Sequence, residues 1–211
     1  MSLFVILLGG NLAVTERLKR QIAGARVIAA DSGIRHAQTL GISVEAWIGD
    51  FDSSTPEMDQ TYNSIPRLAF SADKAMTDGE LAVEEAIRRG ANALVLAGAL
   101  GGPRSDHAMQ HVMLMLALAE RGIPVLLTSG AEEALPLLAG ECRPDLPPGT
   151  VFSIIALDNL SGLSVKGAKW PLDRQNAAFG SSLTLSNQAK EGLSINLKRG
   201  CAAIFANLST S

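Results

Sequence analysis

The sequence predicts an α/β protein in which a parallel sheet flanked by helices is followed by a small all-β sandwich. Two observations support this fold class. From residue 3 to residue 128, short apolar runs of strand length alternate with helical segments, and turns rich in glycine or acidic residues separate them. After residue 150 no helical period is found, and short segments with β-branched and alternating residues follow.

The composition favours a folded protein and gives no indication of a nucleic-acid-binding, disulfide-rich or membrane protein. Hydrophobic residues make up 47% of the 211 residues and charged residues 18%, which is typical of a folded protein. The formal net charge of −3 gives no basic excess, so we expect no nucleic-acid partner. Two cysteines are too few for a disulfide scaffold and indicate a reducing compartment. The apolar run at residues 3–8 is too short for a signal peptide or a membrane span, so we expect a cytoplasmic protein with no membrane partner.

Three strands open the predicted sheet, at residues 3–8, 26–30 and 46–48. The turn after the first, Gly9-Gly10-Asn11, is of the kind that lets backbone N–H groups approach a phosphate. The second strand runs into Asp31-Ser32-Gly33, and the third into the acidic segment at residues 49–54. Helices are expected between the strands, at residues 15–22 and 34–40, and Gly41 ends the second helix.

The sheet is expected to continue with an apolar segment at residues 68–70 and strands at 93–97 and 125–128. Thr77-Asp78-Gly79-Glu80 has the spacing of a capping box and opens a helix that Arg88-Arg89-Gly90 ends. The glycine-rich turn at residues 98–103 precedes a long helix that begins at Ser105. We expect that helix to bury a seam formed by Met109, Val112, Met113 and Leu116.

These patterns divide the chain into a Rossmann-like α/β domain at residues 1–138, a linker at 139–150 and a β-rich domain at 151–211. The linker is rich in proline and acidic residues. Strands of the last domain are expected at residues 151–157, 163–165, 182–186, 193–197 and 202–208. A unit of about 60 residues rarely has a large core of its own, so we expect it to pack against the first domain or a second subunit.

Asp50 and Asp52 follow the third strand at positions i and i+2. If the segment stays extended, both carboxylates point the same way and Phe51 points to the opposite side. Paired carboxylates repel each other unless a cation lies between them, and Mg²⁺ is the usual cation when substrate phosphates complete the site. The alternative is a plain turn, in which aspartate and serine cap backbone groups.

Polar or glycine-rich residues follow five of the predicted strands. Ligands of parallel α/β sheets bind beyond the carboxyl ends of the strands, so we expect these residues to converge on one edge. They are Gly9, Gly10 and Asn11; Asp31 and Ser32; Asp50 and Asp52; Lys74, Thr77 and Asp78; and Arg104, Asp106 and His107.

Several of these motifs, in the same order, are found in one family. They are A-A-D-S-G at residues 29–33, I-G-D-F-D-S at 48–53, T-D-G-E-L-A at 77–82, G-A-L-G-G at 98–102 with R-S-D-H at 104–107, K-W-P-L at 169–172 and L-S-N at 185–187. Together they resemble thiamine pyrophosphokinase. The resemblance implies a homodimer with an ATP-binding α/β catalytic domain and a C-terminal thiamine-binding β domain. It also implies transfer of the pyrophosphoryl group of ATP to the hydroxyl of thiamine, which gives thiamine diphosphate and AMP.

The residues suit that chemistry, which requires that the triphosphate be held, its charge neutralised and the hydroxyl aligned. Asp50, Asp52 and Asp78 are the expected Mg²⁺ ligands, and Asp31 is a further ligand or a partner for the attacking hydroxyl. The expected nucleotide-binding residues are Gly10, Asn11, Ser32, Lys74, Thr77, Arg104, Asp106 and His107. Simpler roles remain open, because Thr77 can be a helix cap and Asp106 can interact with the helix dipole alone.

Thiamine carries a permanent positive charge on a flat ring. Trp170 can stack on that ring and attract its charge, although core filling is an equal alternative. By resemblance, Ser186 and Asn187 would hydrogen-bond the aminopyrimidine, and without the resemblance they would be assigned to a turn.

Three positions depart from the family pattern and bear on the metal geometry. Ala75 stands where members of the family usually have a carboxylate, Pro103 is an added residue, and His111 stands where asparagine is common. Two other functions therefore stay open. One is a pyrophosphokinase for another small alcohol such as a hydroxymethylpterin, and the other is a binding protein for thiamine or a nucleotide that has lost turnover.

Overall fold

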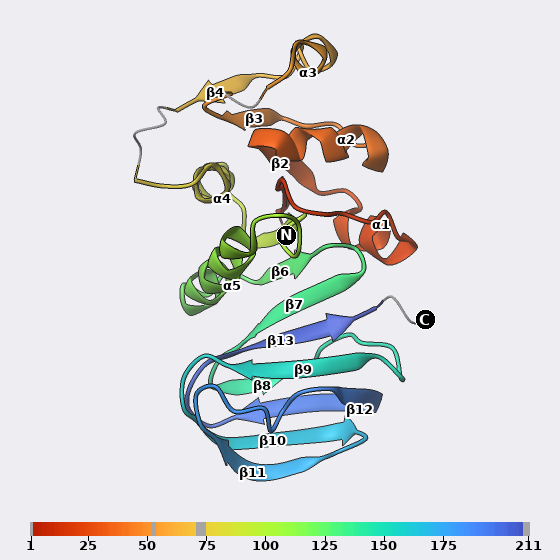
Figure 1. The fold of residues 1–211 in the computed structure, drawn as a ribbon, viewed down its shortest axis with the longest axis vertical. Helices are drawn as coiled ribbons and strands as arrows, with labels where there is room; N and C mark the ends of the chain where they lie inside the picture. The colour runs from red at the N-terminus through yellow and green to blue at the C-terminus, as the bar shows by residue number, and fades with distance from the viewer. Residues whose placement is uncertain (1, 52–53, 71–74, 209–211) are drawn as a thin grey trace. The chain divides into compact units, whose positions relative to one another are not determined.

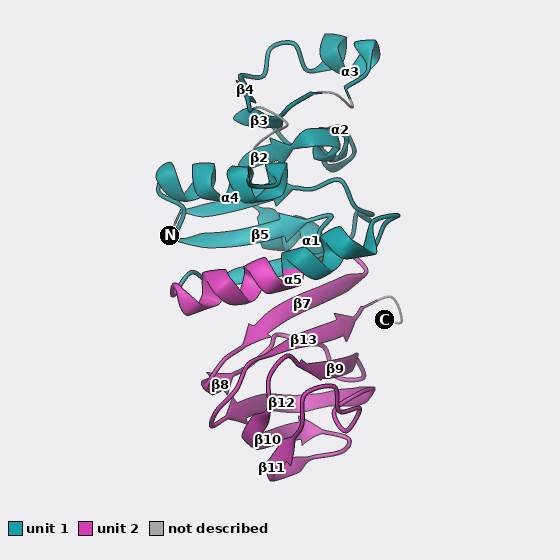
Figure 2. Ribbon diagram, turned by 60° about the vertical axis from the view of Figure 1, so that its left-hand side comes forward, with its two compact units in different colours: residues 1–111, 123–130 teal, residues 112–122, 131–211 magenta. Residues whose placement is uncertain are grey.

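The computed structural model describes residues 2–51, 54–70 and 75–208. Asp52 and Lys74, two of the predicted site residues, lie outside these ranges. The chain forms two compact units, one of residues 1–111 with 123–130 and the other of residues 112–122 with 131–211 (Figure 2). The division falls within helix α5 (Ser105–Glu120).

The first unit contains a parallel sheet in the order β6-β5-β1-β2-β3-β4. Figure 1 labels four of these strands, β2, β3, β4 and β6. Its strands are β1 (Leu3–Leu7), β2 (Arg26–Ala30), β3 (Ala46–Gly49), β4 (Arg67–Ala69), β5 (Ala93–Ala97) and β6 (Val125–Thr128). Parallel strands with helices on the sheet bury both faces, which explains why the apolar runs are continuous. Phe4, Ile28 and Leu96 are fully buried. The predicted parallel sheet is confirmed, and β1 lies between β2 and β5.

Helices follow most of these strands. They are α1 (Glu16–Ile22), the 3₁₀ turn η1 (Asp31–Ile34), α2 (Arg35–Leu40), α3 (Pro56–Thr61), α4 (Asp78–Arg88) and α5. Helix α4 packs against β1, β2 and β3. Its N-terminus has the predicted capping box, in which the N–H of Glu80 donates to Thr77 Oγ1 (3.2 Å) and the N–H of Thr77 donates to Glu80 Oε2 (2.9 Å). In the described part of the chain no helix is long and apolar enough to cross a membrane.

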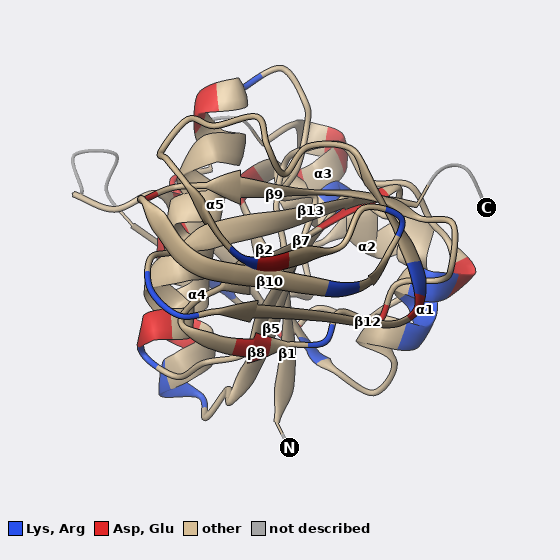
Figure 3. Ribbon diagram, turned by 90° about the horizontal axis from the view of Figure 1, so that it is seen from below, with Lys and Arg blue, Asp and Glu red and all other residues tan. Residues whose placement is uncertain are grey.

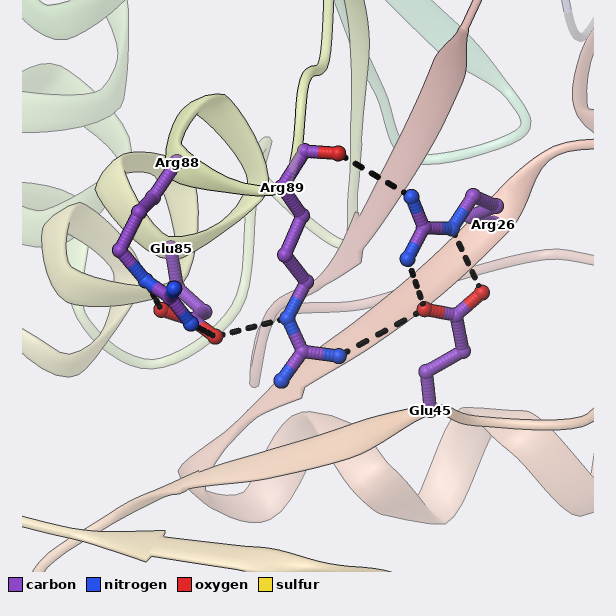
Figure 4. A network of polar contacts seen from close by, with 5 residues as sticks. All are labelled: Arg26, Glu45, Glu85, Arg88 and Arg89. Atoms are coloured by element: carbon purple, nitrogen blue, oxygen red, sulfur yellow. Dashed lines mark hydrogen bonds and ion pairs between the residues drawn. The ribbon is translucent and has the colours of Figure 1, made fainter.

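A network of ion pairs joins the end of α4 to the start of β2 and β3 (Figure 4). Arg26 makes a two-pronged pair with Glu45, at 2.8 and 2.7 Å, and Arg89 lies 3.5 Å from the same carboxylate. Glu85 in turn accepts from Arg88 and Arg89. The guanidinium groups of Arg88 and Arg89 lower the pKa of Glu85 to about 2, and the hydrogen bond from Arg88 is the largest cause.

Apart from the last part of α5, the second unit is built of β-strands, and its paired strands are antiparallel. β7, β13 and β9 pair in that order, and β8, β12, β10 and β11 form a second row. The rows meet where Asn187 and Gln188 of β12 pair with β9. Phe152, Leu163 and Ile195 are among the core side chains. The strands are β7 (Glu132–Leu137), β8 (Gly140–Cys142), β9 (Val151–Ala156), β10 (Leu160–Ala168), β11 (Leu172–Ala177), β12 (Asn187–Leu197) and β13 (Ala202–Asn207). In Figure 3, acidic and basic residues are interspersed among these strands.

Several predicted elements of the second half were wrong. Residues 182–186 are a turn, in which the N–H of Leu185 donates to Ser182 O (3.1 Å), and β12 begins only at Asn187. Strand β11 was missed because its residues are largely polar and exposed. The predicted linker at residues 139–150 contains β8. On α5, Val112 and Leu116 are buried as expected, but Met109 and Met113 are exposed.

Candidate active site

A cavity of about 580 Å³ opens in the first unit at the carboxyl ends of β1, β2, β3 and β5. Its volume lies within the range of small-ligand sites. Nine of the predicted residues line it: Gly9, Gly10, Asp31, Ser32, Asp50, Thr77, Asp78, Arg104 and His107. Asn11 and Asp106 do not line it. The structure therefore brings together the residues that follow separate strands, while the role of each one stays a prediction.

Two glycine loops form part of the wall by packing backbone against backbone. The N–H of Gly10 donates to Gly98 O (3.0 Å). A Cβ at Gly10 would lie 2.4 Å from that oxygen, and a Cβ at Gly98 would lie 2.4 Å from Leu8 O. Gly98 also has a φ of +78°, which favours glycine. The loops after β1 and β5 thus require glycine for close approach, and they leave room for a ligand above them.

Two acidic turns hold Asp31 and Asp50 at the cavity, and both turns contain a residue with positive φ. Asp31 has φ = +44° and Phe51 has φ = +62°. The chain is therefore not extended at Phe51, and Asp52, the other carboxylate of the expected pair, lies outside the described residues. The indole of Trp47 contacts both turns, since its Nε1–H donates to Asp31 O (2.8 Å) and its ring packs edge-on against Phe51, with ring centroids 5.0 Å apart.

The start of α4 forms another part of the wall, through Thr77, Asp78 and Gly79. Thr77 caps the helix, so the structural role considered for it is confirmed, and it also lines the cavity. Gly79 is buried, and a Cβ there would lie 3.0 Å from Leu8 Cδ2 and 3.7 Å from His111 Nε2. The N–H groups and partial positive charge of a helix start favour anions.

The donor atoms around the cavity suit a hard cation. Asp31, Asp50 and Asp78 contribute carboxylates, and Mg²⁺ usually takes one or two carboxylates together with substrate phosphates and water. Among the described residues, no three acidic, histidine or cysteine side chains lie close enough to hold a metal by themselves. Ala75 is exposed and has no donor atom. The metal set of Asp50, Asp52 and Asp78 stays a prediction.

Arg104 reaches the cavity from the loop before α5, but its guanidinium is held by Asp106. Nε donates to Oδ1 (2.9 Å) and Nη2 donates to Oδ2 (2.7 Å). This two-pronged pair holds the pKa of the Asp106 carboxyl well below its ordinary value. Asp106 therefore orients Arg104 and does not itself face the ligand space.

Two of the three histidines of the chain line the cavity, and the third, His36, contacts the loop after β1. His107 is exposed and lines the cavity, and His111 is buried and lines it too. His111 Nδ1 lies 2.9 Å from Ala99 O, and His36 Nε2 lies 3.0 Å from Gly10 O. A carbonyl only accepts, so each of these nitrogens carries a proton. Burial lowers the pKa of both imidazoles, which favours their neutral forms.

Sequence reasoning missed the roles of Arg35 and His36. Arg35 lines the cavity, and its Nη2 donates to the carbonyl oxygens of Gly9 and Gly10. The sequence feature that could have indicated them is an Arg-His pair, which follows the Asp-Ser-Gly turn after one intervening residue. An arginine next to a histidine on a short helix is too common a feature to indicate a site without the fold.

The predicted substrate residues lie in the second unit, where Trp170 and Asn187 line a small cavity of about 90 Å³. The Asn187 amide binds the backbone of Trp170 at both ends: Nδ2 donates to Trp170 O (2.7 Å) and Oδ1 accepts from Trp170 N–H (3.1 Å). Trp170 is 53% exposed as a residue, and Lys169 Nζ lies 4.6 Å from the centroid of its ring. Ser186 does not line this cavity, and its N–H donates to Ser153 Oγ (3.0 Å).

Comparison with known proteins agrees with these features. Residues 20–127 match the family described as "Thiamin pyrophosphokinase, catalytic domain", and residues 141–202 match "Thiamin pyrophosphokinase, vitamin B1 binding domain". The chain is 28% identical over 151 residues to "Thiamine pyrophosphokinase" of Bacillus subtilis, which covers 70% of each protein.

Solved structures show the same fold. The thiamine pyrophosphokinase of B. subtilis superposes with a TM-score of 0.84 at 20% identity, covering 98% of this chain and 99% of the other. The protein of Geobacillus thermodenitrificans gives 0.82 at 22% identity, covering 100% and 99%. The yeast enzyme gives 0.80 at 13% identity, covering 98% and 86%. Because the catalytic-domain match alone spans just over half of the 211 residues, the chain belongs to the thiamin pyrophosphokinase family.

Proposed function

We propose that this protein transfers the pyrophosphoryl group of ATP to the hydroxyl of thiamine, giving thiamine diphosphate and AMP, with Mg²⁺ as the metal. One observation carries the proposal. A single chain matches both the catalytic and the vitamin B1 binding domains of the family, in that order, and the first match contains most of the cavity lining, including Asp31, Asp50, Asp78 and the glycine loop after β5.

The first unit supplies what pyrophosphoryl transfer needs. The glycine loops after β1 and β5 and the start of α4 present backbone to the phosphates, and Arg104 adds positive charge. Asp50, Asp52 and Asp78 would hold Mg²⁺, which neutralises phosphate charge when bound. We place ATP here because anion-binding backbone and hard-cation ligands face one space.

The reaction forms a bond between the thiamine oxygen and the β-phosphorus and breaks the bond from that phosphorus to the oxygen bridging to the α-phosphate. AMP leaves with the bridging oxygen. We propose Asp31 as the partner of the attacking hydroxyl, whose proton it would accept, because it lines the cavity together with Asp50 and Asp78. The backbone of Asp31 is held by Trp47, whose Nε1–H donates to the Asp31 carbonyl oxygen.

The second unit contains the residues predicted to bind thiamine, and we propose that its fold is a small β sandwich. Trp170 offers an exposed ring for stacking. The adjoining cavity of about 90 Å³ is much smaller than the ~300 Å³ of the smallest usual ligand sites, so it cannot enclose thiamine alone. Exposed Phe179, Leu183 and Leu185 are further apolar surface in this unit. These features support a homodimer in which a second copy completes the site.

The cellular location is inferred from the thiols. Cys142 and Cys201 are both free, which supports the cytoplasm, where thiols stay reduced.

The two other functions are not favoured. A pyrophosphokinase for a hydroxymethylpterin would have no need of a vitamin B1 binding domain, yet residues 141–202 match one. A binding protein without turnover would rest on Ala75 alone, while the carboxylates of Asp31, Asp50 and Asp78 are all kept at the cavity.

The test is AMP release by the purified protein with ATP and Mg²⁺, in parallel reactions with thiamine, a hydroxymethylpterin or no acceptor. We expect AMP and thiamine diphosphate in equal amounts with thiamine only. AMP with the pterin alone would replace thiamine as the substrate. Bound thiamine without AMP would show that the protein is a binder.

A further inference from the structure

Positive charge at the cavity comes from two arginines in the described part of the chain, Arg35 and Arg104. They reach it from two different strands. Arg35 is the first residue of α2, which follows β2, and Arg104 lies in the loop after β5. Because β1 pairs with β2 on one side and with β5 on the other, the two arginines flank the Gly9-Gly10 loop that follows β1.

The charges of the two arginines are not equally available. Both prongs of the Arg104 guanidinium bind the carboxylate of Asp106, so a phosphate must compete with that carboxylate. Arg35 makes no ion pair with any described residue. Its hydrogen bonds to described residues use one nitrogen, Nη2, which donates to the carbonyl oxygens of Gly9 and Gly10. Within the described chain its Nε and Nη1 donors remain unused.

The surroundings of Arg35 favour an anion as the missing partner. The cavity is also lined by the carboxylates of Asp31, Asp50 and Asp78, yet none of them is paired with Arg35. A guanidinium that is anchored at one nitrogen keeps a fixed position, so its two remaining edges lose little freedom when they bind phosphate oxygens. The neighbouring His36 holds the same Gly10 carbonyl, which anchors the loop a second time without adding charge.

We propose that Arg35 is a phosphate-binding residue that contacts the polyphosphate of the nucleoside triphosphate and so favours triphosphate over monophosphate. This inference rests on the proposed function, since it assumes that the cavity takes ATP. Arg35 bridges the loop after β1 and the ligand, and it opposes Arg104 across that loop.

The experiment measures binding of ATP, ADP and AMP by calorimetry, with Mg²⁺ and without thiamine, for the unaltered protein, Arg35→Gln and Arg35→Lys. We expect Arg35→Gln to weaken ATP binding by about 10- to 100-fold and AMP binding by less than about threefold, because only ATP and ADP offer phosphates beyond the first. Arg35→Lys keeps the charge but not the fork, so its loss for ATP should be intermediate.

His36→Ala is the matched control, because it removes a bond to the same Gly10 carbonyl without removing a charge. If Arg35 only held the loop, Arg35→Gln and His36→Ala would behave alike, and each would lose affinity for ATP and for AMP to the same extent. Arg35 is exposed, so the variants are expected to fold, and thermal unfolding checks this.

Two outcomes overturn the inference. If the unaltered protein binds ATP and Arg35→Gln binds it equally well, or loses ATP and AMP affinity to the same extent, Arg35 does not read the polyphosphate. If the unaltered protein binds none of the three nucleotides, the proposed function fails together with the inference.

Discussion

The indole N–H of Trp47 donates to the carbonyl oxygen of Asp31 over 2.8 Å, and this bond joins the ends of two neighbouring strands. Trp47 is buried in β3, while Asp31 begins the turn after β2 with a φ of +44°. The same indole packs edge-on against Phe51, directly after Asp50. One buried side chain thus fixes the backbone next to two carboxylates of the candidate active site.

Replacing Trp47 by phenylalanine should weaken both folding and turnover. Phenylalanine keeps an aromatic ring but loses the indole N–H and part of the buried ring volume. Loss of the donor to the Asp31 carbonyl should cost about 1–3 kcal/mol, and the cavity adds to this. We expect kcat for AMP formation to fall about 10-fold, because a small displacement of a reacting group is costly. Denaturant unfolding and steady-state kinetics measure the two effects.

Tyr62→Phe is the control, since Tyr62 packs edge-on against Trp47 and keeps its ring in the variant. It should change stability by less than about 0.5 kcal/mol and leave kcat unaltered. Normal turnover of Trp47→Phe would show that the bond to the Asp31 carbonyl does not affect the position of the Asp31 carboxylate.

Asp50→Asn should lower kcat by at least about 100-fold, because an amide cannot replace a carboxylate in holding Mg²⁺ and neutralising the transferred group. The remaining activity should require more Mg²⁺, which a titration of the metal measures. Asp59→Asn serves for comparison, because Asp59 pairs with Arg67 and does not line the cavity. Undiminished ATP turnover by Asp50→Asn would remove Asp50 from the metal set.

Gly98→Ala should destabilise the protein by about 2–4 kcal/mol, because the substitution causes both backbone strain and a steric clash. The added Cβ would lie 2.4 Å from Leu8 O, at a φ of +78°. Gly24→Ala isolates the strain, because Gly24 has a φ of +71° and nothing within 4 Å of the added Cβ. That variant should lose only about 1 kcal/mol in the same chemical unfolding experiment. Equal losses would mean that the loops after β1 and β5 can separate at little cost.

Stability should fall as pH drops below the ordinary histidine pKa of about 6.5, and His111 should contribute to the fall. Burial and the nearby His107 lower the pKa of His111 in the folded protein, so the unfolded chain binds more protons in this range. The contribution is complete above pH 6.5 and is lost as pH falls towards the folded-state pKa. His111→Asn should flatten the curve of unfolding free energy between pH 7 and 5. His36 has a lowered pKa as well, so part of the slope should remain.

A second loss is expected in acid from Glu85, whose folded-state pKa of about 2 lies below the ordinary value of 4.5. The stabilisation is present above pH 4.5 and is lost as pH falls towards 2. Glu85→Gln should cost about 1–2 kcal/mol at neutral pH, since Arg88 is largely solvent-exposed and the pair is partly screened. The difference between the variant and the unaltered protein should vanish near pH 2. A difference that persists there would point to lost packing and not to lost charge.

Sequence patterns predicted the first unit better than the second. The apolar runs of β1, β2 and β5 and the capping box at Thr77 are determined by residues close together in the chain, where strand length and helix capping act. β7 contains Pro136 and begins with two glutamates, and β11 is polar, so neither has a local strand pattern. Their pairing with β13 and β10 makes them strands.

By itself, the sequence determined the strand and helix order of the first unit, the ordered motifs of one family and the chemistry of the carboxylates after the strands. Tertiary structure decided which of those residues share a cavity, because that depends on β1 lying between β2 and β5, which are far from it and from each other in the chain. It also placed Arg35 beside the Gly9-Gly10 loop and tied Asn187 to the Trp170 backbone. Contacts of this kind arise from strand order and packing over long separations, and no local periodicity encodes them.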